Sequence, residues 1–444
     1  MHTKWYKHYI TGLLLVVYIF NQTDRSIFGV LMEPIRRELW LSDSELGFLA
    51  GPALAVLYAI LGIPIARLAD RGRRVDIIAV AVALWSVTVM LSATVHQFWQ
   101  LAAVRVGVGI GEAGFSAIAQ SLIGDYHSVS ERPKALSVFM LAIPFGALLS
   151  NLLGGWANEV GGWRMAFFLA GLPGVALAFL VKFSIREPLN GSTRGVLLTD
   201  GGAGQPSFRT VFLVLWRRKS LRHLAIAMAL INMACACALT WIPTFFIRCH
   251  GMATTELGVW LGLVTSVGGG FGTWLGGYTV SRYAPHAPRR QMHLVALAAA
   301  LSAPCFAAVL FCPLAYPALL LLLPAYLLMF FYFGPSFSWV QSLSPVNVRS
   351  AMTATVILGQ ILLAGVVGVQ LVGVLSDWVS TGNSGSSLRV SMALFSLLGL
   401  WAAVHFYWAG RSIPQDLTQM DGDQVIPDSP IGGGTELTRG TSDA

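Results

Sequence analysis

Four charged residues lie inside stretches of the chain that are otherwise strongly apolar. Asp24 and Arg25 are adjacent in the first such stretch, and Arg105 and Glu112 share a later one. At the centre of a membrane each of these charges costs at least ~2.5–3.5 kcal/mol, so it must pair, face the protein interior or line a pathway. Two acids and two arginines in this setting can bind protons and anions.

The spacing of these residues predicts which of them pair. Arg105 and Glu112 are seven residues apart, so they share one helix face but lie about 10.5 Å apart along its axis, too far for a direct bond. Asp24 and Arg25 project about 100° apart and reach different partners. We therefore predict that Asp24 lies near Arg105 and that Arg25 lies near Glu112.

This network admits two interpretations. In one it is purely structural and fastens two spans together; in the other its acids carry protons, as buried acids in transporters commonly do. We assign proton coupling to Asp24 and Glu112, with Asp24 as the main proton-binding group. Glu112 and Arg25 are expected to act chiefly as a structural and gating pair, and the polar Asn21 belongs to the same site.

The composition places these residues in a membrane. Of the 444 residues, 55% are hydrophobic and only 11% are charged, whereas soluble domains average about 25% charged. With a mean hydropathy of +0.67, this excludes a soluble globular enzyme, a disordered chain and a coiled coil. The apolar residues come in long runs, which predict helices rather than barrel strands. We expect an all-α polytopic membrane protein with twelve transmembrane helices, at about 9–31, 44–66, 75–94, 98–122, 133–156, 164–183, 221–247, 255–280, 293–311, 315–339, 350–374 and 390–409.

Composition also divides the chain. We expect two six-helix halves at 1–183 and 221–410, joined by a central cytoplasmic loop at 184–220 that contains prolines, glycines and a basic run. Two such halves can rock about a central site. The polar segment 411–444 predicts a disordered cytoplasmic tail.

The basic residues predict an orientation. There are 29 Lys and Arg against 21 acids, a net charge of +8. With both termini inside, the basic residues outside the spans fall in cytoplasmic loops, as the positive-inside rule requires, except the outer set: Arg36, Arg37, Arg164, Arg248 and Arg389. The concentration of basic residues in cytoplasmic loops accounts for the net positive charge, so a nucleic-acid partner is not needed to explain it. The five cysteines show no metal or disulfide spacing, and no catalytic motif is visible, so we expect neither a cofactor nor an enzyme.

A basic cluster follows the second span. Asp70, Arg71, Arg73 and Arg74 resemble the signature loop of the major facilitator superfamily, although Ala66 stands where glycine is usual and the loop is one residue short. The arginines are either ordinary positive-inside charge or, with Asp70, a conformational latch that pairs across the two halves.

A longer stretch sharpens the resemblance. The segment Glu112–Ser121, followed by Gly124–Tyr126, is similar to the spinster-like branch of that superfamily, although Gln120 replaces a usual proline. Matching segments recur at 143–146, 163–167, 171–174, 186–188 and 241–243. The resemblance implies the major facilitator fold and an alternating-access transporter of lysophospholipid-like or sphingoid amphiphiles, with proton coupling in some members. We expect a monomer in a bacterial inner membrane.

Aromatic residues dominate the second half. Trp241, Phe245, Phe330 and Phe333 either pack against lipid and core or line the apolar side of a cavity whose first half is charged. The second possibility suits a substrate with an ionic head and a hydrocarbon tail. Two alternatives stay open: a proton-coupled symporter of small organic anions or sugar acids, with Arg25 or Arg105 holding a carboxylate, and a lipid-modifying membrane enzyme, which the lack of a nucleophile or metal site disfavours.

Overall fold

The apolar runs fold as helices because lipid offers the backbone no hydrogen-bond partner, and a helix satisfies its own N–H and C=O groups. The computed structural model describes residues 4–128, 130–188, 208–284, 287–345, 348–379 and 384–424, and the regular elements within them are all helices. Their bounds are α1 Lys4–Leu39, α2 Asp43–Ala50, α3 Pro52–Arg71, α4 Arg74–Leu91, η1 Ser92–Thr94, α5 Phe98–Glu112, α6 Phe115–Tyr126, α7 Arg132–Met140, α8 Ala142–Ser184, α10 Phe208–Arg217, α11 Lys219–His250, α12 Thr254–Tyr283, α13 Pro288–Phe311, α14 Ala315–Phe330, α15 Phe333–Ser342, α16 Arg349–Ile361, η3 Leu362–Gly368, α17 Val369–Trp378, α18 Ser384–Ser396 and α19 Leu398–Gln424.

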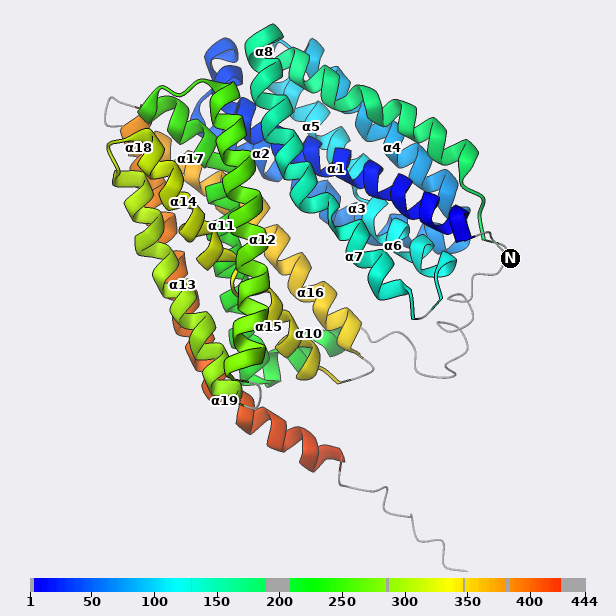
Figure 1. The fold of residues 1–444 in the computed structure, drawn as a ribbon, viewed down its shortest axis with the longest axis vertical. Helices are drawn as coiled ribbons and strands as arrows, with labels where there is room; N and C mark the ends of the chain where they lie inside the picture. The colour runs from blue at the N-terminus through cyan, green and yellow to red at the C-terminus, as the bar shows by residue number, and fades with distance from the viewer. Residues whose placement is uncertain are drawn as a thin grey trace, which may run out of the picture.

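Twelve membrane crossings can be traced through these helices. By length and apolar composition alone, nine segments of the described chain qualify. One of them holds two crossings, because α8 leaves helical geometry at Gly161 and Gly162 and the chain turns back there (Figure 1). Helices α1 and α12 are also long enough to cross, although charged residues lower the apolar character of α1 and glycines lower that of α12. The predicted twelve-span, all-α architecture is confirmed.

The crossings form two bundles in chain order. Helices α1 to α8 pack together as the first bundle and α11 to α19 as the second (Figure 1). In the first bundle α1 and α4 both pack against α8, and in the second α11 and α13 both pack against α19. Each bundle therefore has its own helix framework, which allows the two to move relative to each other.

Two segments expected outside the bundles are partly helical. The range 184–220, predicted to be a loop, contains α10, while 189–207 lies outside the described residues. The tail predicted from 411 begins with a continuation of α19 to Gln424. This turn is fixed because Asp416 accepts hydrogen bonds from the backbone N–H, at 2.9 Å, and the hydroxyl of Ser220 at the start of α11. The remainder, 425–444, is outside the described residues.

The bundles meet at one end of the molecule, here called the closed end (residues 33–44, 151–159, 248–258 and 369–378). Gly258 of α12 lies against the backbone carbonyl of Asn151, and Gly373 of α17 lies against that of Asp43, with no room for a β-carbon at either glycine. Small residues let helices in lipid approach this closely. From the closed end the bundles diverge toward the terminal end, which carries the start of α1 and the end of α19 (Figure 1).

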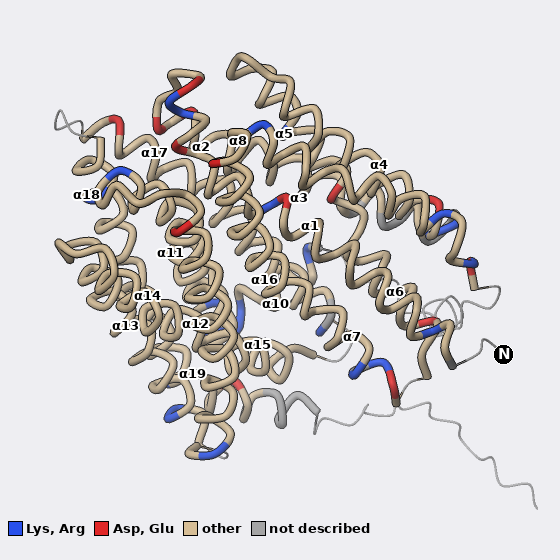
Figure 2. The backbone as a smooth tube through the Cα atoms, turned by 45° about the horizontal axis from the view of Figure 1, so that its top comes forward, with Lys and Arg blue, Asp and Glu red and all other residues tan. Residues whose placement is uncertain are grey.

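Charged residues concentrate at the ends of the helices. Figure 2 shows Lys, Arg, Asp and Glu mostly at the two ends of the molecule, with a few in the middle of the first bundle. The arginines predicted for the outer side lie at the closed end, where Arg164 bonds to the carbonyl oxygen of Val95 at 2.8 Å and Arg248 to Asp43 at 2.7 Å. The few charges at mid-depth are those that require an explanation.

Candidate functional site

The predicted pair of Arg25 and Glu112 is confirmed. Arg25 Nε lies 2.5 Å from Glu112 Oε2, joining α1 to the end of α5. The Glu112 side chain is fully buried, whereas that of Arg25 is 29% exposed, and its guanidinium lies 4.4 Å from the centre of the Tyr58 ring on α3. The cation is thus held by an acid and an aromatic face but keeps part of its surface accessible.

Asp24 and Arg105 lie close enough for their charges to interact, as predicted, but no direct ion pair joins them among the described residues. Arg105 Nε instead donates to the carbonyl oxygen of Leu49 at 3.2 Å, and its guanidinium lies 4.6 Å from the centre of the Phe28 ring. Leu49 is in the last turn of α2, which stops before Gly51, so its carbonyl has no partner in its own helix. The Leu49 carbonyl is therefore free to accept the hydrogen bond from Arg105.

Several buried polar atoms beside this cluster lack a partner among the described residues. They include both carboxylate oxygens of Asp24, Oε1 of Glu112, Nδ2 of Asn21 and the indole nitrogen of Trp85. Asp24 is 1% exposed and Asn21 is 3% exposed. Each such group typically costs about 1–3 kcal/mol, and native proteins keep few of them without a functional reason. The arrangement therefore points to binding of a proton or a polar ligand.

Sequence reasoning missed Trp85 on α4. Its side chain is fully buried, and its ring lies 5.4 Å from that of Phe115 in an edge-on arrangement. A tryptophan in an apolar run gives no sign of its role. The available signal was that a buried indole N–H requires an acceptor, and the Trp85 indole nitrogen has none among the described residues.

The aromatic residues singled out in the second half divide into two groups. Trp241 and Phe245 are fully buried, and the Trp241 indole N–H donates to the Val369 carbonyl at 3.1 Å. Phe330 is half-buried beside Gly269, whereas Phe333 is 43% exposed. In this conformation the first two residues pack in the core, and the last two remain available for contact.

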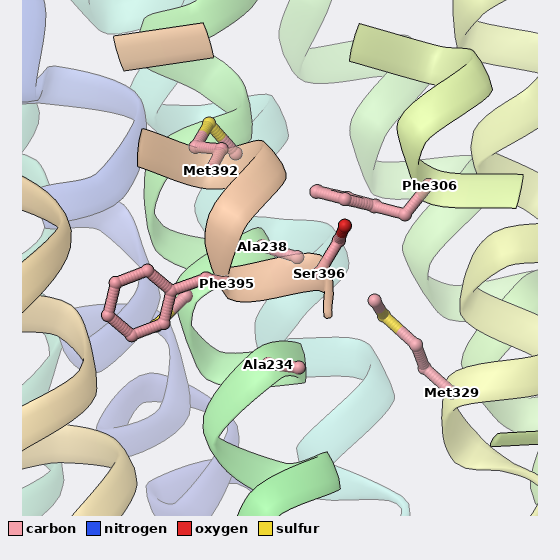
Figure 3. A pocket seen from close by; sticks show the side chains of 8 residues that line it. Ala234, Ala238, Phe306, Met329, Met392, Phe395 and Ser396 are labelled. Carbon is pink, nitrogen blue, oxygen red and sulfur yellow. The ribbon is translucent and has the colours of Figure 1, made fainter. Parts of the chain in front are cut away.

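A small apolar pocket lies inside the second bundle. It is too narrow to hold even a water molecule, and α11, α13, α14 and α18 contribute its lining. Figure 3 shows Phe306, Met329 and Met392 around it, with Ser396 as the one hydroxyl side chain. The lining has no charged group, and in this conformation it leaves no room for a ligand.

The basic cluster after the second span pairs within the first bundle. Arg74 contacts Asp125 at 2.6 Å and Glu187 at 2.9 Å, and Arg73 lies 3.6 Å from Asp76. The side chains of Asp70 and Arg71 are outside the described residues. Because the bundles diverge at this end, a latch across the two halves remains a prediction for another conformation.

A second charged network joins the bundles at the closed end. Arg248 of α11 contacts Glu33 of α1 at 2.6 Å and Asp43 of α2 at 2.7 Å, and all three side chains are nearly buried. Ser376 of α17 adds a 2.6 Å hydrogen bond to Asp43. Sequence reasoning counted Arg248 only as an outer charge. The acids Glu33, near the end of α1, and Asp43, at the start of α2, were the available signal that Arg248 has an acidic partner.

Glu112→Gln is expected to lower thermal stability more than Asp24→Asn does. Removing one member of a buried ion pair costs about 3–5 kcal/mol, because the other charge is left uncompensated, whereas the Asp24 carboxylate has no partner to strand. Melting of the purified variants in detergent measures the difference. The double variant Arg25→Gln/Glu112→Gln should recover part of the loss, and equal melting of the two single variants would contradict the pairing.

Comparison with known proteins finds relatives that are membrane transporters. A family model described as the Major Facilitator Superfamily matches residues 14–362. An MFS-type efflux pump of Mycolicibacterium smegmatis is 30% identical over 92% of this chain and 94% of that protein. The sphingosine-1-phosphate transporter SPNS2 of Danio rerio is 30% identical over 53% of this chain and 47% of that protein.

Two further comparisons bear on substrate and on fold. A probable L-galactonate transporter of Escherichia coli is 26% identical over 60% of this chain and 60% of that protein. A solved bacterial homologue of the human lysosomal transporter Spinster, in an inward-facing and unoccupied conformation, superposes with a TM-score of 0.83. It is 24% identical, and the match covers 93% of this chain and 99% of that chain, so this likeness shows the fold.

Proposed function

Because the chain belongs to the major facilitator superfamily, we propose that it moves an amphipathic lysophospholipid- or sphingoid-like substrate by alternating access, coupled to protons. Membership in this family makes it a multi-pass membrane transporter rather than an enzyme. The spinster-like resemblance of its motifs is confirmed by relatives named spinster. The substrate and the coupling are our proposals.

One observation carries the choice of substrate, namely the unequal polarity of the two bundles. The first bundle holds Asp24, Arg25, Arg105 and Glu112 at mid-depth, whereas the second carries its described charges near the helix ends (Figure 2). An anionic head is best placed on the first bundle and a hydrocarbon tail on the second. A small, uniformly polar substrate would gain nothing from the apolar side.

The head is proposed to bind at the two arginines. Arg25 is the more accessible of them, with 29% of its side chain exposed, and Arg105 is held only by a carbonyl and an aromatic face. Guanidinium groups bind phosphate through charge-assisted, paired hydrogen bonds. An arriving phosphate would therefore compete well for Arg105.

The tail is proposed to lie along Phe330 and Phe333, with Trp241 and Phe245 closing the apolar side in other conformations. We place the tail there because the Phe333 side chain is 43% exposed and can be contacted, whereas Trp241 is fully buried. The narrow apolar gap lined by Phe306 and Met329 would have to widen to receive the end of the tail.

Proton coupling is proposed to run through Asp24. A buried carboxyl group without a partner is costly to keep charged, so Asp24 is suited to take up a proton in this conformation. When the proton leaves, the anion can attract Arg105 from the Leu49 carbonyl, which forms the pair predicted from spacing. Binding of a proton and of an anionic head would thus compete for one arginine.

Orientation and assembly follow the same proposal. We place both termini on the cytoplasmic side of a bacterial inner membrane, with a monomer as the working unit. The bias of basic residues toward the terminal end supports this orientation. Asp70, Arg71, Arg73 and Arg74 would then form a cytoplasmic latch that closes when the closed end opens.

A second candidate is a symporter of sugar acids. The similarity to the probable L-galactonate transporter supports it, and Arg25 could hold a carboxylate as readily as a phosphate. Uptake into proteoliposomes under an inward acid gradient separates the candidates. Labelled lysophospholipid should accumulate and be displaced by unlabelled sphingoid phosphate, but not by galactonate. Displacement by galactonate alone would favour the sugar acid.

Truncating Phe333 to alanine is expected to weaken long-chain substrates more than short-chain ones. Each methylene removed from water contributes about 0.8 kcal/mol, so losing the aromatic surface should flatten the dependence of affinity on chain length. Binding of a lysolipid series by the purified variant measures this. Phe179→Ala is the matched control, because Phe179 is 63% exposed and stacks on Phe183 in the first bundle; an equal change in both variants would remove Phe333 from the tail site.

A further inference from the structure

The short helix α10 takes no part in the proposed transport, yet it is well placed for another role. It ends at Arg217, directly before α11 enters its membrane crossing at Lys219. It contacts α11 and α16 at the terminal end of the second bundle (Figure 1). Arg218, the residue after α10, donates a hydrogen bond to the Leu343 carbonyl, which fixes the helix at the level where the crossing begins.

The two faces of α10 differ in what they contact. Val211 is 2% exposed and belongs to the core of the second bundle. On the other side Phe212, Leu213 and Trp216 are 48%, 42% and 57% exposed. Phe212 and Trp216 stack at 6.0 Å one helical turn apart, and the Arg222 guanidinium lies 5.4 Å from the Trp216 ring. An apolar, ordered surface is therefore presented outward.

The charges along this segment of the sequence are all positive. Between Phe208 and Arg222 the sequence has five basic residues and no acid. Arg209, Arg217 and Lys219 form no ion pair with any residue that the structure describes. Cations without acidic partners beside exposed aromatic rings indicate an external anionic partner of large extent.

We propose that α10 is a membrane-surface helix that binds anionic phospholipid. Its Phe212, Leu213 and Trp216 enter the boundary between headgroups and acyl chains, while Arg209 and Arg217 contact the phosphates. Aromatic residues favour this boundary, and basic clusters on amphipathic helices beside a membrane crossing bind anionic lipid. The bilayer is the one partner that supplies both an apolar layer and a sheet of negative charge at this depth.

The test compares unfolding midpoints in nanodiscs of phosphatidylcholine alone and of phosphatidylcholine with phosphatidylglycerol. The anionic lipid should raise the midpoint of the unmodified protein. Arg209→Gln/Arg217→Gln should lose more than half of this rise. Arg289→Gln/Arg290→Gln removes the same charge from exposed positions at the start of α13 and should retain it.

Two further arms separate the alternatives. Soluble glycerol phosphate, at the headgroup concentration of the nanodiscs, should leave the midpoint unchanged; a rise equal to that from lipid would overturn the membrane assignment. Trp216→Ala should reduce the lipid-dependent rise, whereas Trp99→Ala, which removes a 75% exposed tryptophan elsewhere, should not. Absence of any rise in the unmodified protein, or equal losses in the two double-arginine variants, would also overturn the proposal.

Discussion

Replacing Asp24 with asparagine is expected to abolish proton-driven uptake while leaving the protein folded. The substitution keeps the shape of the side chain and removes its ability to gain and lose a proton. Since neither carboxylate oxygen has a partner among the described residues, no ion pair is broken. Without the Asp24 carboxyl group, the site has lost its main proton-binding group, on which the pH gradient is proposed to act.

Proteoliposomes with and without a pH gradient measure this loss. Gradient-driven accumulation should fall to background in Asp24→Asn, while exchange of substrate at equal pH continues. Asp76→Asn is the matched control, because Asp76 pairs with Lys182 at 2.8 Å on a partly exposed surface and should behave as the unmodified protein. A normal pH response in Asp24→Asn would remove this residue from the coupling mechanism.

Arg248→Ala is expected to open the closed end. The substitution removes the buried arginine that lies between Glu33 and Asp43. These nearly buried acids then keep only the more exposed Arg36 and Arg37 as partners. Breaking a buried pair costs about 3–5 kcal/mol, and the cost falls on the conformation in which the bundles meet. By the rule that 1.4 kcal/mol is a factor of ten, the equilibrium should shift toward the other conformation by up to about three and a half orders of magnitude.

Distances between spin labels on the two bundles at the closed end report this shift directly. The distribution should move to longer values in Arg248→Ala. Arg164→Ala, which removes an arginine bonded to Glu38 within the first bundle, should leave it unchanged. An unaltered distribution in Arg248→Ala would show that the network does not hold the closed end.

The architecture was predictable because it depends on the lengths of the apolar runs. A crossing helix requires about 20 apolar residues, and most of the crossings are visible in the sequence as apolar runs of that length. The Arg25–Glu112 pair was predictable for a related reason. A buried arginine and a buried acid cannot remain unpaired in lipid, and each has few possible partners other than the opposite charge.

The features that the sequence did not reveal share a physical cause, since each depends on a contact between distant segments. Arg105 bonds to the Leu49 carbonyl, which is free only because α2 stops before Gly51. The role of Arg248 depended on how α11 meets α1 and α2. The burial of Trp241 could not be read from a bundle that is apolar on every side.

The helix α10 was missed for a different reason. The prolines and glycines of the range 184–220 all lie between Pro188 and Pro206. They led us to interpret the whole range as a loop and obscured the short amphipathic stretch at its end. Phe212 and Trp216, four residues apart in the sequence, were the available sign of a helix; in the structure their rings stack. Composition averaged over a long segment therefore hides an element as short as α10.

Binding of a series of lysophospholipids with increasing acyl length to the purified protein tests the central claim most directly. If the substrate places its head on the arginines and its tail on the second bundle, affinity should rise with each added methylene, by up to about 0.8 kcal/mol, until the apolar side is filled. Arg105→Gln should lower the whole series by a constant factor, because the head contact is common to all members. A flat series in the unmodified protein would contradict the amphiphile assignment and leave the sugar-acid symporter as the better account.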